Sequence, residues 1–140
     1  MQTDLLLLDT HCWVWFQFGL EKKFSRHSYR RIERALRLDR CVVSIVSVWE
    51  IGLLVSKGRL QLRMPTRDWI GQALSLPGLS LEPLSVPAAL DSSALPGEFH
   101  GDPADRMLVA TARHLQASLA TADTAILAYG AGGHVSTMEC

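Results

Sequence analysis

The chain has 140 residues, of which 48% are apolar and 20% are charged. This composition suits a single domain, residues 1–140, with its own hydrophobic core, and excludes a disordered or low-complexity chain. Fourteen basic and fourteen acidic residues leave no net charge, so the total does not indicate a polyanion-binding protein. No uninterrupted apolar run approaches the ~20 residues of a membrane span, and we expect neither a membrane anchor nor a signal peptide.

Short apolar runs alternate with longer helical patterns along the chain. The predicted elements are a strand at 5–8, a helix at 25–38, a strand at 41–43, a helix at 47–56, a short helix from 66, a strand at 79–84, a helix from 85, a helix at 102–116, a strand at 118–121 and a strand at 135–137. Strands separated by helices favour a parallel sheet with helices on both faces. We therefore expect an α/β domain with a central, mostly parallel sheet of four to five strands.

Several of these helices begin at recognisable capping residues. Ser47 is expected to cap the helix at 47–56, and Thr66 the short helix that follows it. Asp102 gives the strongest signal, because Pro103 and Asp105 stand at the first and third helical positions, where proline and acidic residues are favoured.

The charges are unevenly distributed. Residues 22–40 hold eight basic residues and two acidic ones, a net charge of +6 that the rest of the chain must balance. One surface can then be cationic and another anionic, as expected of a protein that handles both nucleic acid and metal ions. The arginine-rich helix could contact RNA phosphates, although a solvated outer face is the commoner role of such a helix.

The three cysteines indicate the compartment. Cys12, Cys41 and Cys140 are far apart in the sequence and form no CxxC pair. This spacing argues against a disulfide framework and against a zinc site made of thiolates, and it favours the reducing cytoplasm.

Four acidic residues stand where they can meet at one edge of the sheet. Asp9 follows the first strand, Glu50 lies one turn into the helix after the second, and Asp123 lies two residues beyond the fourth. The carboxyl ends of parallel strands share one edge, and sites in open α/β sheets gather there. Asp105 lies at the start of the helix that precedes the fourth strand, so spacing alone places it less firmly.

Each of these acids also has an ordinary structural interpretation. Asp9 and Asp123 suit turns, Glu50 completes an S-x-x-E capping box with Ser47, and Asp105 suits the first turn of a helix. Taken together, the four acids point to a shared site. Glu50 lies in an otherwise apolar helix, where a capping role does not require it. Crowded carboxylates repel one another unless a cation neutralises them. Oxygen ligands without a thiolate cluster suit Mg²⁺ or Mn²⁺. The residues thus predict a site for a hard metal ion, with phosphodiester cleavage as its leading use.

Four short blocks carry a resemblance to a known family. They are Leu-Leu-Leu-Asp9-Thr10-His11, Ser44-x-x-Ser47-x-x-Glu50-Ile51, Asp102-Pro103-Ala104-Asp105-Arg106 and Thr121-Ala122-Asp123. In this order they resemble the PIN domain, and most of all the VapC-type toxins, which are the ribonucleases of bacterial type II toxin–antitoxin pairs. Each block alone is a weak motif, but the four together span essentially the whole chain.

The resemblance implies an endoribonuclease that depends on Mg²⁺ or Mn²⁺ and hydrolyses RNA phosphodiesters with metal-activated water. Asp9 and Asp105 match the acids that hold the metal most directly, and Glu50 and Asp123 match the acids that support them. Thr10, Asp102 and Thr121 match accessory positions of the family's site. We expect Asp102 to act mainly as a helix cap and only secondarily as a site residue. The implied partners are an RNA substrate, a VapB-like antitoxin and a second copy of the chain in a homodimer, without a membrane.

Other interpretations stay open at this point. The acids could belong to a PIN-type nuclease with a housekeeping role in RNA processing, or to a non-catalytic protein-binding module in which they serve as caps and surface charge. A phosphatase of the haloacid-dehalogenase kind needs a second aspartate two residues after Asp9, where His11 stands. We expect His11 and His100 to be structural and leave them out of the site.

Overall fold

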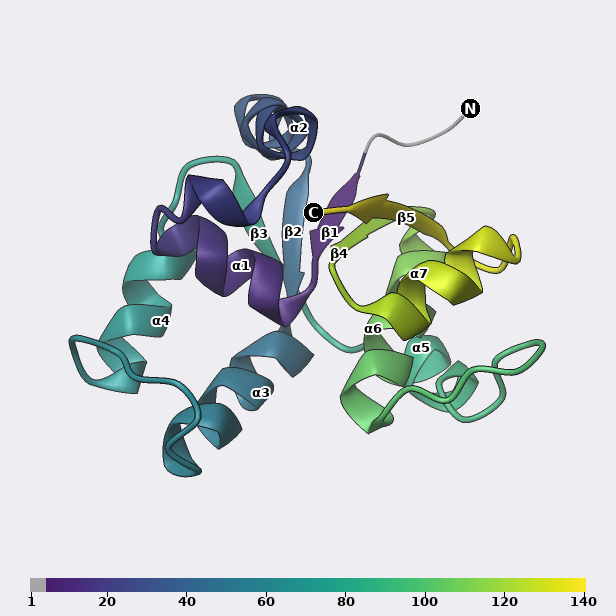
Figure 1. Cartoon of the computed structure of the whole chain (residues 1–140). Coiled ribbons are helices and arrows are strands. Elements are labelled where there is room, and N and C mark those ends of the chain that lie inside the picture. Colours follow the sequence, from purple (N-terminus) through teal and green to yellow (C-terminus); the bar gives the residue numbers. More distant parts are fainter. Residues whose placement is uncertain (1–4) are drawn as a thin grey trace.

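The computed structural model describes residues 5–140 and contains a five-stranded sheet with helices on both sides (Figure 1). The strands are β1 (Leu6–Leu8), β2 (Cys41–Ser44), β3 (Leu79–Glu82), β4 (Ser118–Thr121) and β5 (Ser136–Glu139). Their spatial order is β3-β2-β1-β4-β5, and every neighbouring pair is parallel. The expected α/β fold is confirmed, with the larger of the two expected strand numbers.

Seven α-helices and one 3₁₀ helix connect these strands within residues 5–140. They are α1 (Thr10–Gln17), η1 (Glu21–Lys23), α2 (Arg26–Arg37), α3 (Ile45–Ser56), α4 (Thr66–Leu74), α5 (Val86–Asp91), α6 (Pro103–Leu115) and α7 (Thr124–Ala131). None of the helices in this part of the chain has the length and apolar character needed to cross a membrane.

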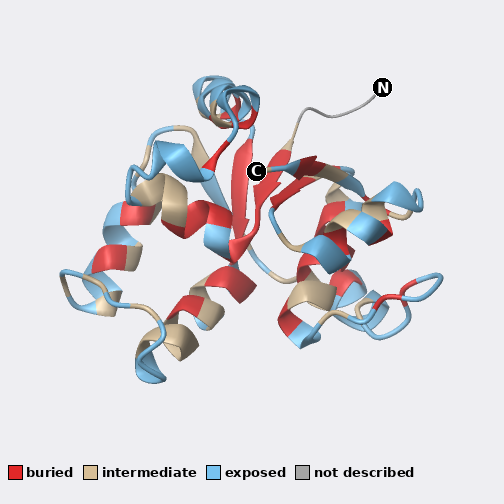
Figure 2. Ribbon diagram, in the orientation of Figure 1, coloured by how far each residue is buried: buried red, intermediate tan, exposed pale blue. Residues whose placement is uncertain are grey.

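The central strand β1 is buried on both faces of the sheet (Figure 2). Successive side chains of a strand point to opposite faces, and Leu6 and Leu8 accordingly enter the core formed with α1, α2, α3 and α4. Leu7 enters the other core, formed mainly with α5, α6 and α7. Figure 1 shows these two groups of helices on either side of the strands. An unbroken apolar run is what a strand covered on both faces requires, which explains the four leucines at 5–8.

Two of the three expected helix caps differ from the prediction. α3 begins two residues earlier than expected, because Ser44 rather than Ser47 is its cap and accepts a hydrogen bond from Val46 N at 3.0 Å. The interpretation of Glu50 as part of a capping box is therefore wrong. Thr66 is already helical, and no side chain caps α4. The cap at Asp102 is confirmed, since its Oδ1 accepts a hydrogen bond from Asp105 N at 2.8 Å.

Two helices, α1 and α7, were not predicted from the sequence. Both begin at an aspartate that was interpreted only as a turn residue or site residue. Asp9 caps α1 by accepting a hydrogen bond from Thr10 N, and Asp123 caps α7 by accepting one from Ile126 N. β3 also ends at Glu82, two residues before its predicted end.

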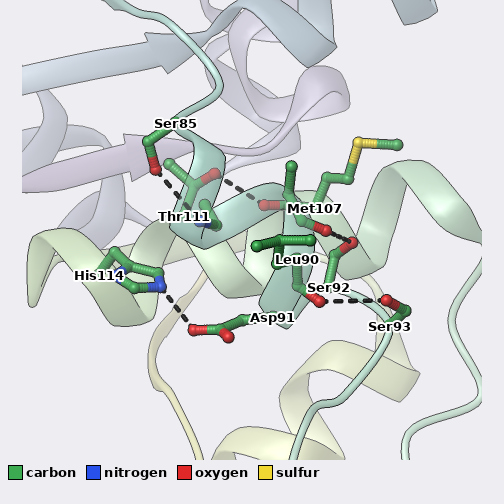
Figure 3. Close-up of polar contacts among 10 residues, drawn as sticks. Ser85, Leu90, Asp91, Ser92, Ser93, Met107, Thr111 and His114 are labelled. Carbon is green, nitrogen blue, oxygen red and sulfur yellow. Dashed lines mark hydrogen bonds and ion pairs between the residues drawn. The ribbon is translucent and has the colours of Figure 1, made fainter.

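The helices α5 and α6 are joined by polar contacts (Figure 3). His114 Nε2 on α6 lies 2.7 Å from Asp91 Oδ2 on α5. Within α6, Thr111 Oγ1 donates to the carbonyl of Met107 at 2.8 Å, and Ser85 caps α5. α5 therefore supports α6, the helix whose first turn carries Asp105.

Gly78 allows the turn before β3 to approach α2. Its φ is +88°, and a Cβ atom at this position would lie 1.8 Å from the carbonyl oxygen of Leu36. We expect Gly78→Ala to lower the free energy of unfolding by about 2 kcal/mol or more, because a left-handed backbone and a backbone clash must both be relieved. Urea unfolding followed by circular dichroism measures this change.

The matched control is Gly71→Ala in α4, where a new Cβ would meet no atom within 4 Å. This variant should be neutral or slightly stabilising, because alanine favours a helix more than glycine does. Equal losses of stability in the two variants would contradict the interpretation of Gly78.

Candidate active site

A cleft of about 320 Å³ contains the predicted acidic residues. Its lining residues are Asp9, His11, Trp15, Glu50, Asp102, Asp105, Ala122 and Asp123. The four acids that the sequence analysis singled out therefore share one cleft, although they come from four separate segments. None of these lining residues is a lysine or an arginine.

Asp9 is a buried lining residue of this cleft, with 5% of its surface exposed. It directly follows β1, and both of its carboxylate oxygens accept hydrogen bonds. Thr10 N donates to Oδ1 at 2.7 Å, and Thr121 Oγ1 donates to Oδ2 at 2.6 Å. Burial raises the pKa of Asp9 above its ordinary value of 3.8, and the two hydrogen bonds oppose that shift.

Glu50 is connected to Asp9 through Thr10. The Thr10 side chain is buried, and its Oγ1 donates to Glu50 Oε1 at 2.5 Å. The same Thr10 Oγ1 lies 2.8 Å from Ser47 Oγ, which explains why Ser47 belongs to the interior of the fold rather than to a helix cap. Burial and the charge of Asp9 raise the pKa of Glu50, while the hydrogen bond from Thr10 lowers it.

Asp105 is partly buried in the first turn of α6, among the other acids of the cleft. Burial, followed by the charges of Asp102 and Asp9, raises the pKa of Asp105 to about 7. Asp102 is both the cap of α6 and a lining residue of the cleft, as the sequence analysis allowed. These carboxylates therefore create a strongly anionic region.

Thr121 connects the end of β4 to the acids on both sides of it. Its buried hydroxyl donates to Asp9 and accepts a hydrogen bond from Asp123 N at 3.0 Å. Asp123 in turn caps α7 through Oδ1 and lines the cleft. The structure thus brings Thr121 and Thr10 against the acids that they were expected to support.

His11 lines the cleft, so the expectation that it lies outside the site is wrong, and Trp15, which the sequence analysis did not assign to the site, lines it as well. The two residues are four positions apart on α1, and their rings are 6.0 Å apart. Prediction of a helix at 10–17 would have placed them on one face of it. A charge on His11 lowers the pKa of both Asp9 and Glu50. His100, by contrast, is outside the lining of the cleft and lies 3.9 Å from Glu98.

The arginine-rich helix corresponds to α2, and its arginines are exposed, as expected. A separate hollow is lined by Arg31 and Arg34 together with Leu6, the first residue of β1. Asp9 follows the carboxyl end of that strand, so α2 and the acidic cleft lie toward opposite ends of the parallel strands (Figure 1). Direct contact of these arginines with RNA stays a prediction.

The donor chemistry of the cleft fits a hard divalent cation. Its ligand atoms are carboxylate oxygens, with no thiolate and no basic side chain other than His11 among the lining residues. Within residues 5–140, no group of three or more His, Cys, Asp or Glu side chains is arranged to hold a metal ion. Mg²⁺ often binds proteins through one or two carboxylates and completes its shell with water, so a pair such as Asp9 and Asp105 suits it.

Known proteins share the sequence pattern and the fold of this chain. Residues 6–131 match the sequence model of the PIN domain. Ribonuclease VapC22 of Mycobacterium tuberculosis is 33% identical over 108 residues, which cover 76% of this chain and 78% of that protein.

Solved structures with a similar fold include VapBC2 from Rickettsia felis, which is bound to a DNA fragment from the promoter of VapBC2. That match has a TM-score of 0.71 and 16% identity, and covers 96% of this chain and 98% of the other. DNA-bound VapBC from Salmonella typhimurium matches with a TM-score of 0.67 and 15% identity, covering 98% of each chain. At these identities the likeness is one of fold.

The acidic cleft predicts how stability depends on pH. Because the pKa of Asp105 is about 7 in the folded chain and 3.8 ordinarily, the folded state binds more protons between these values, and stability falls as pH rises through them. Asp105→Asn removes this contribution. We expect its melting temperature to exceed that of the parent by a few degrees at pH 8 and to match it near pH 4, with partial exposure limiting the effect.

Differential scanning fluorimetry from pH 4 to pH 8 measures the difference. Asp68→Asn, an exposed aspartate in the first turn of α4, is the matched control and should follow the pH profile of the parent. A profile for Asp105→Asn that falls as steeply as that of the parent would show that Asp105 contributes nothing to it.

Proposed function

The chain belongs to the PIN domain family, and on that premise we propose that it is a metal-dependent ribonuclease that acts as the toxin of a toxin–antitoxin pair. The observation that carries this proposal is the meeting of Asp9, Glu50, Asp105 and Asp123 in one cleft. A set of carboxylates without a neutralising lysine or arginine is unfavourable for stability but suits a site that handles a divalent cation and phosphate. A 33% identical relative that is named a ribonuclease supports the same activity.

Within this proposal Asp9 and Asp105 are the primary metal ligands, and Glu50 and Asp123 support them. Mg²⁺ or Mn²⁺, when bound, supplies the positive charge that activates water and stabilises negative charge on a phosphoryl group. Asp9 can present its carboxylate in one orientation only, because Thr10 N and Thr121 Oγ1 hold its two oxygens.

The accessory residues are Thr10, Thr121 and Asp102. Thr10 holds Glu50 through its hydroxyl, and Thr121 holds Asp9. Asp102 fixes the first turn of α6 and thereby the direction from which Asp105 enters the cleft. We assign a positioning role to all three.

We propose RNA as the substrate, a VapB-like antitoxin and a second copy of the chain as protein partners, and the cytoplasm as the compartment. The similar solved structures are VapBC assemblies bound to DNA, which supports an antitoxin partner. Large apolar side chains that are exposed in the chain by itself offer surface for such partners: Trp49 on α3 is 57% exposed, and Val86 and Leu90 on α5 are 73% and 68% exposed. The free cysteines agree with a reducing compartment.

Asp9→Asn tests the activity. Asparagine retains an oxygen that can cap α1, so the fold should survive while the negative charge of the carboxylate is lost. We expect cleavage of a labelled RNA in the presence of Mn²⁺ to fall by about 100-fold or more, and the growth arrest caused by the parent to disappear.

Asp68→Asn on α4 serves as the control and should cleave RNA and arrest growth like the parent. Circular dichroism checks that both variants fold. An Asp9→Asn variant that is folded and as active as the parent would exclude Asp9 from the reaction. Cleavage by the parent without growth arrest would favour the housekeeping nuclease.

Binding of the cation is tested separately from catalysis. In the parent, Mn²⁺ at about 100 times its dissociation constant should stabilise the fold by about 2.7 kcal/mol, seen as a rise in melting temperature. We expect the double variant Asp9→Asn/Asp105→Asn to lose this rise, and Glu98→Gln, which alters an exposed acid outside the cleft, to retain it. An equal rise in the double variant would place the bound ion elsewhere.

A further inference from the structure

Two cysteines far apart in the sequence are neighbours in the fold. Cys12 lies on α1 and Cys140 directly follows β5, and their sulfur atoms are 2.8 Å apart. Both are free thiols. The S–S bond of a disulfide is about 2.05 Å long, so a covalent link requires a movement of less than about 1 Å.

Separate parts of the fold hold each of the two thiols in place. Cys12 is completely buried in the core between α1 and the sheet. Cys140 continues the β4–β5 ladder, because its N–H donates to the carbonyl of Thr121 at 3.0 Å, and its side chain packs against the same core. Figure 1 shows the chain after β5 directed toward α1. The proximity of the sulfur atoms therefore follows from the packing of two ordered elements.

The two thiols differ in access to solvent. Cys140 is partly exposed, whereas Cys12 is not exposed at all. The hydrogen bond to Cys140 and burial raise the pKa of Cys12 above its usual range, so Cys12 stays protonated at neutral pH. A small oxidant in solution can therefore reach Cys140 first.

We propose that Cys12 and Cys140 form a reversible oxidation site, in which a peroxide converts the two thiols into an intramolecular disulfide. In the first step the Cys140 sulfur takes one oxygen atom from hydrogen peroxide, giving a sulfenic acid and one water molecule. The Cys12 sulfur then attacks the Cys140 sulfur. The S–S bond forms, the S–O bond breaks, and the departing hydroxyl group takes the Cys12 proton to form a second water molecule. The two thiols lose two electrons, which reduce the peroxide.

Cys41 provides the internal control. Cys41 is the first residue of β2 and pairs in register with Leu6 and Leu79. It therefore lies at the amino ends of the parallel strands, whereas Cys140 follows the carboxyl end of β5. Cys41 is completely buried, and burial raises its pKa to about 12. It has neither the access nor the neighbour that the reaction requires.

The test uses the purified full chain and hydrogen peroxide at neutral pH without reductant. The peroxide is then removed, the chain is unfolded in urea so that buried thiols become accessible, and the remaining thiols are blocked with N-ethylmaleimide. The digest is analysed by mass spectrometry. We expect a peptide containing Cys12 linked to one containing Cys140, the loss of two hydrogen atoms from the chain mass, one blocked thiol at Cys41, and full reversal by dithiothreitol.

Because the bond closes a loop of most of the chain, the oxidised protein should also melt about 5 °C or more above the reduced one. Cys41→Ala should form the same link and show the same rise. Cys140→Ser, which alters a partly exposed side chain, should fold but form no link and show no rise.

Three results would overturn the proposal. One is an oxidised chain in which Cys140 carries two or three oxygen atoms while Cys12 remains a thiol. Another is a link that joins only different chains or that includes Cys41. The third is a link that forms only after unfolding in urea, because it would owe nothing to the folded geometry. The test involves neither RNA nor a metal ion, so its result is independent of the proposed ribonuclease activity.

Discussion

The buried carboxylate of Asp9 is the constraint on which the site and much of the fold depend. A carboxylate removed from water is costly unless its oxygens are paired, and here the pairs are the backbone of Thr10 and the hydroxyl of Thr121. The second pair requires β1 and β4 to be parallel neighbours in the observed register, in which Leu8 lies beside Ala120. The start of α1, the alignment of the central strands and the position of Asp9 in the cleft are therefore parts of one arrangement.

The other acids of the cleft lower the stability of this arrangement. Asp105 and Glu50 both have raised pKa values because of burial and because other acids are nearby. Two hydrophobic cores, one on each face of the sheet, supply the stability that offsets this repulsion. The arginines of α2 are not among the residues that line the cleft, and two of them line a separate hollow near the start of β1. The arginine-rich helix and the acidic cleft are accordingly separate features of the surface.

Much of the fold could be predicted because apolar runs, turn residues and helical patterns alternate clearly along the chain. The positions of Asp9 and Asp123 after strands, and the parallel sheet that follows from the alternation, were enough to predict a shared site. Helix α1 could not be predicted, because Cys12, Trp13 and Val14 are buried in succession and leave no helical spacing of apolar residues.

The remaining errors concern choices that only tertiary contacts decide. Ser44 and Ser47 both suit a cap, and the contact between Ser47 and Thr10 is made across 37 residues of chain. His11 could not be placed in the cleft without α1. The proximity of Cys12 and Cys140 depends on how α1 and β5 pack on the same sheet, which no local pattern expresses.

Three aspartates of the cleft also initiate helices: Asp9 begins α1, Asp102 begins α6 and Asp123 begins α7. A short side chain with an acceptor oxygen is needed at such a position, and removing it costs about 1 kcal/mol. Alanine substitutions in this cleft would therefore have two effects at once: they would destabilise the start of a helix and remove a carboxylate from the site. Isosteric amides separate the two, since they keep the helix starts intact while they discharge the cleft.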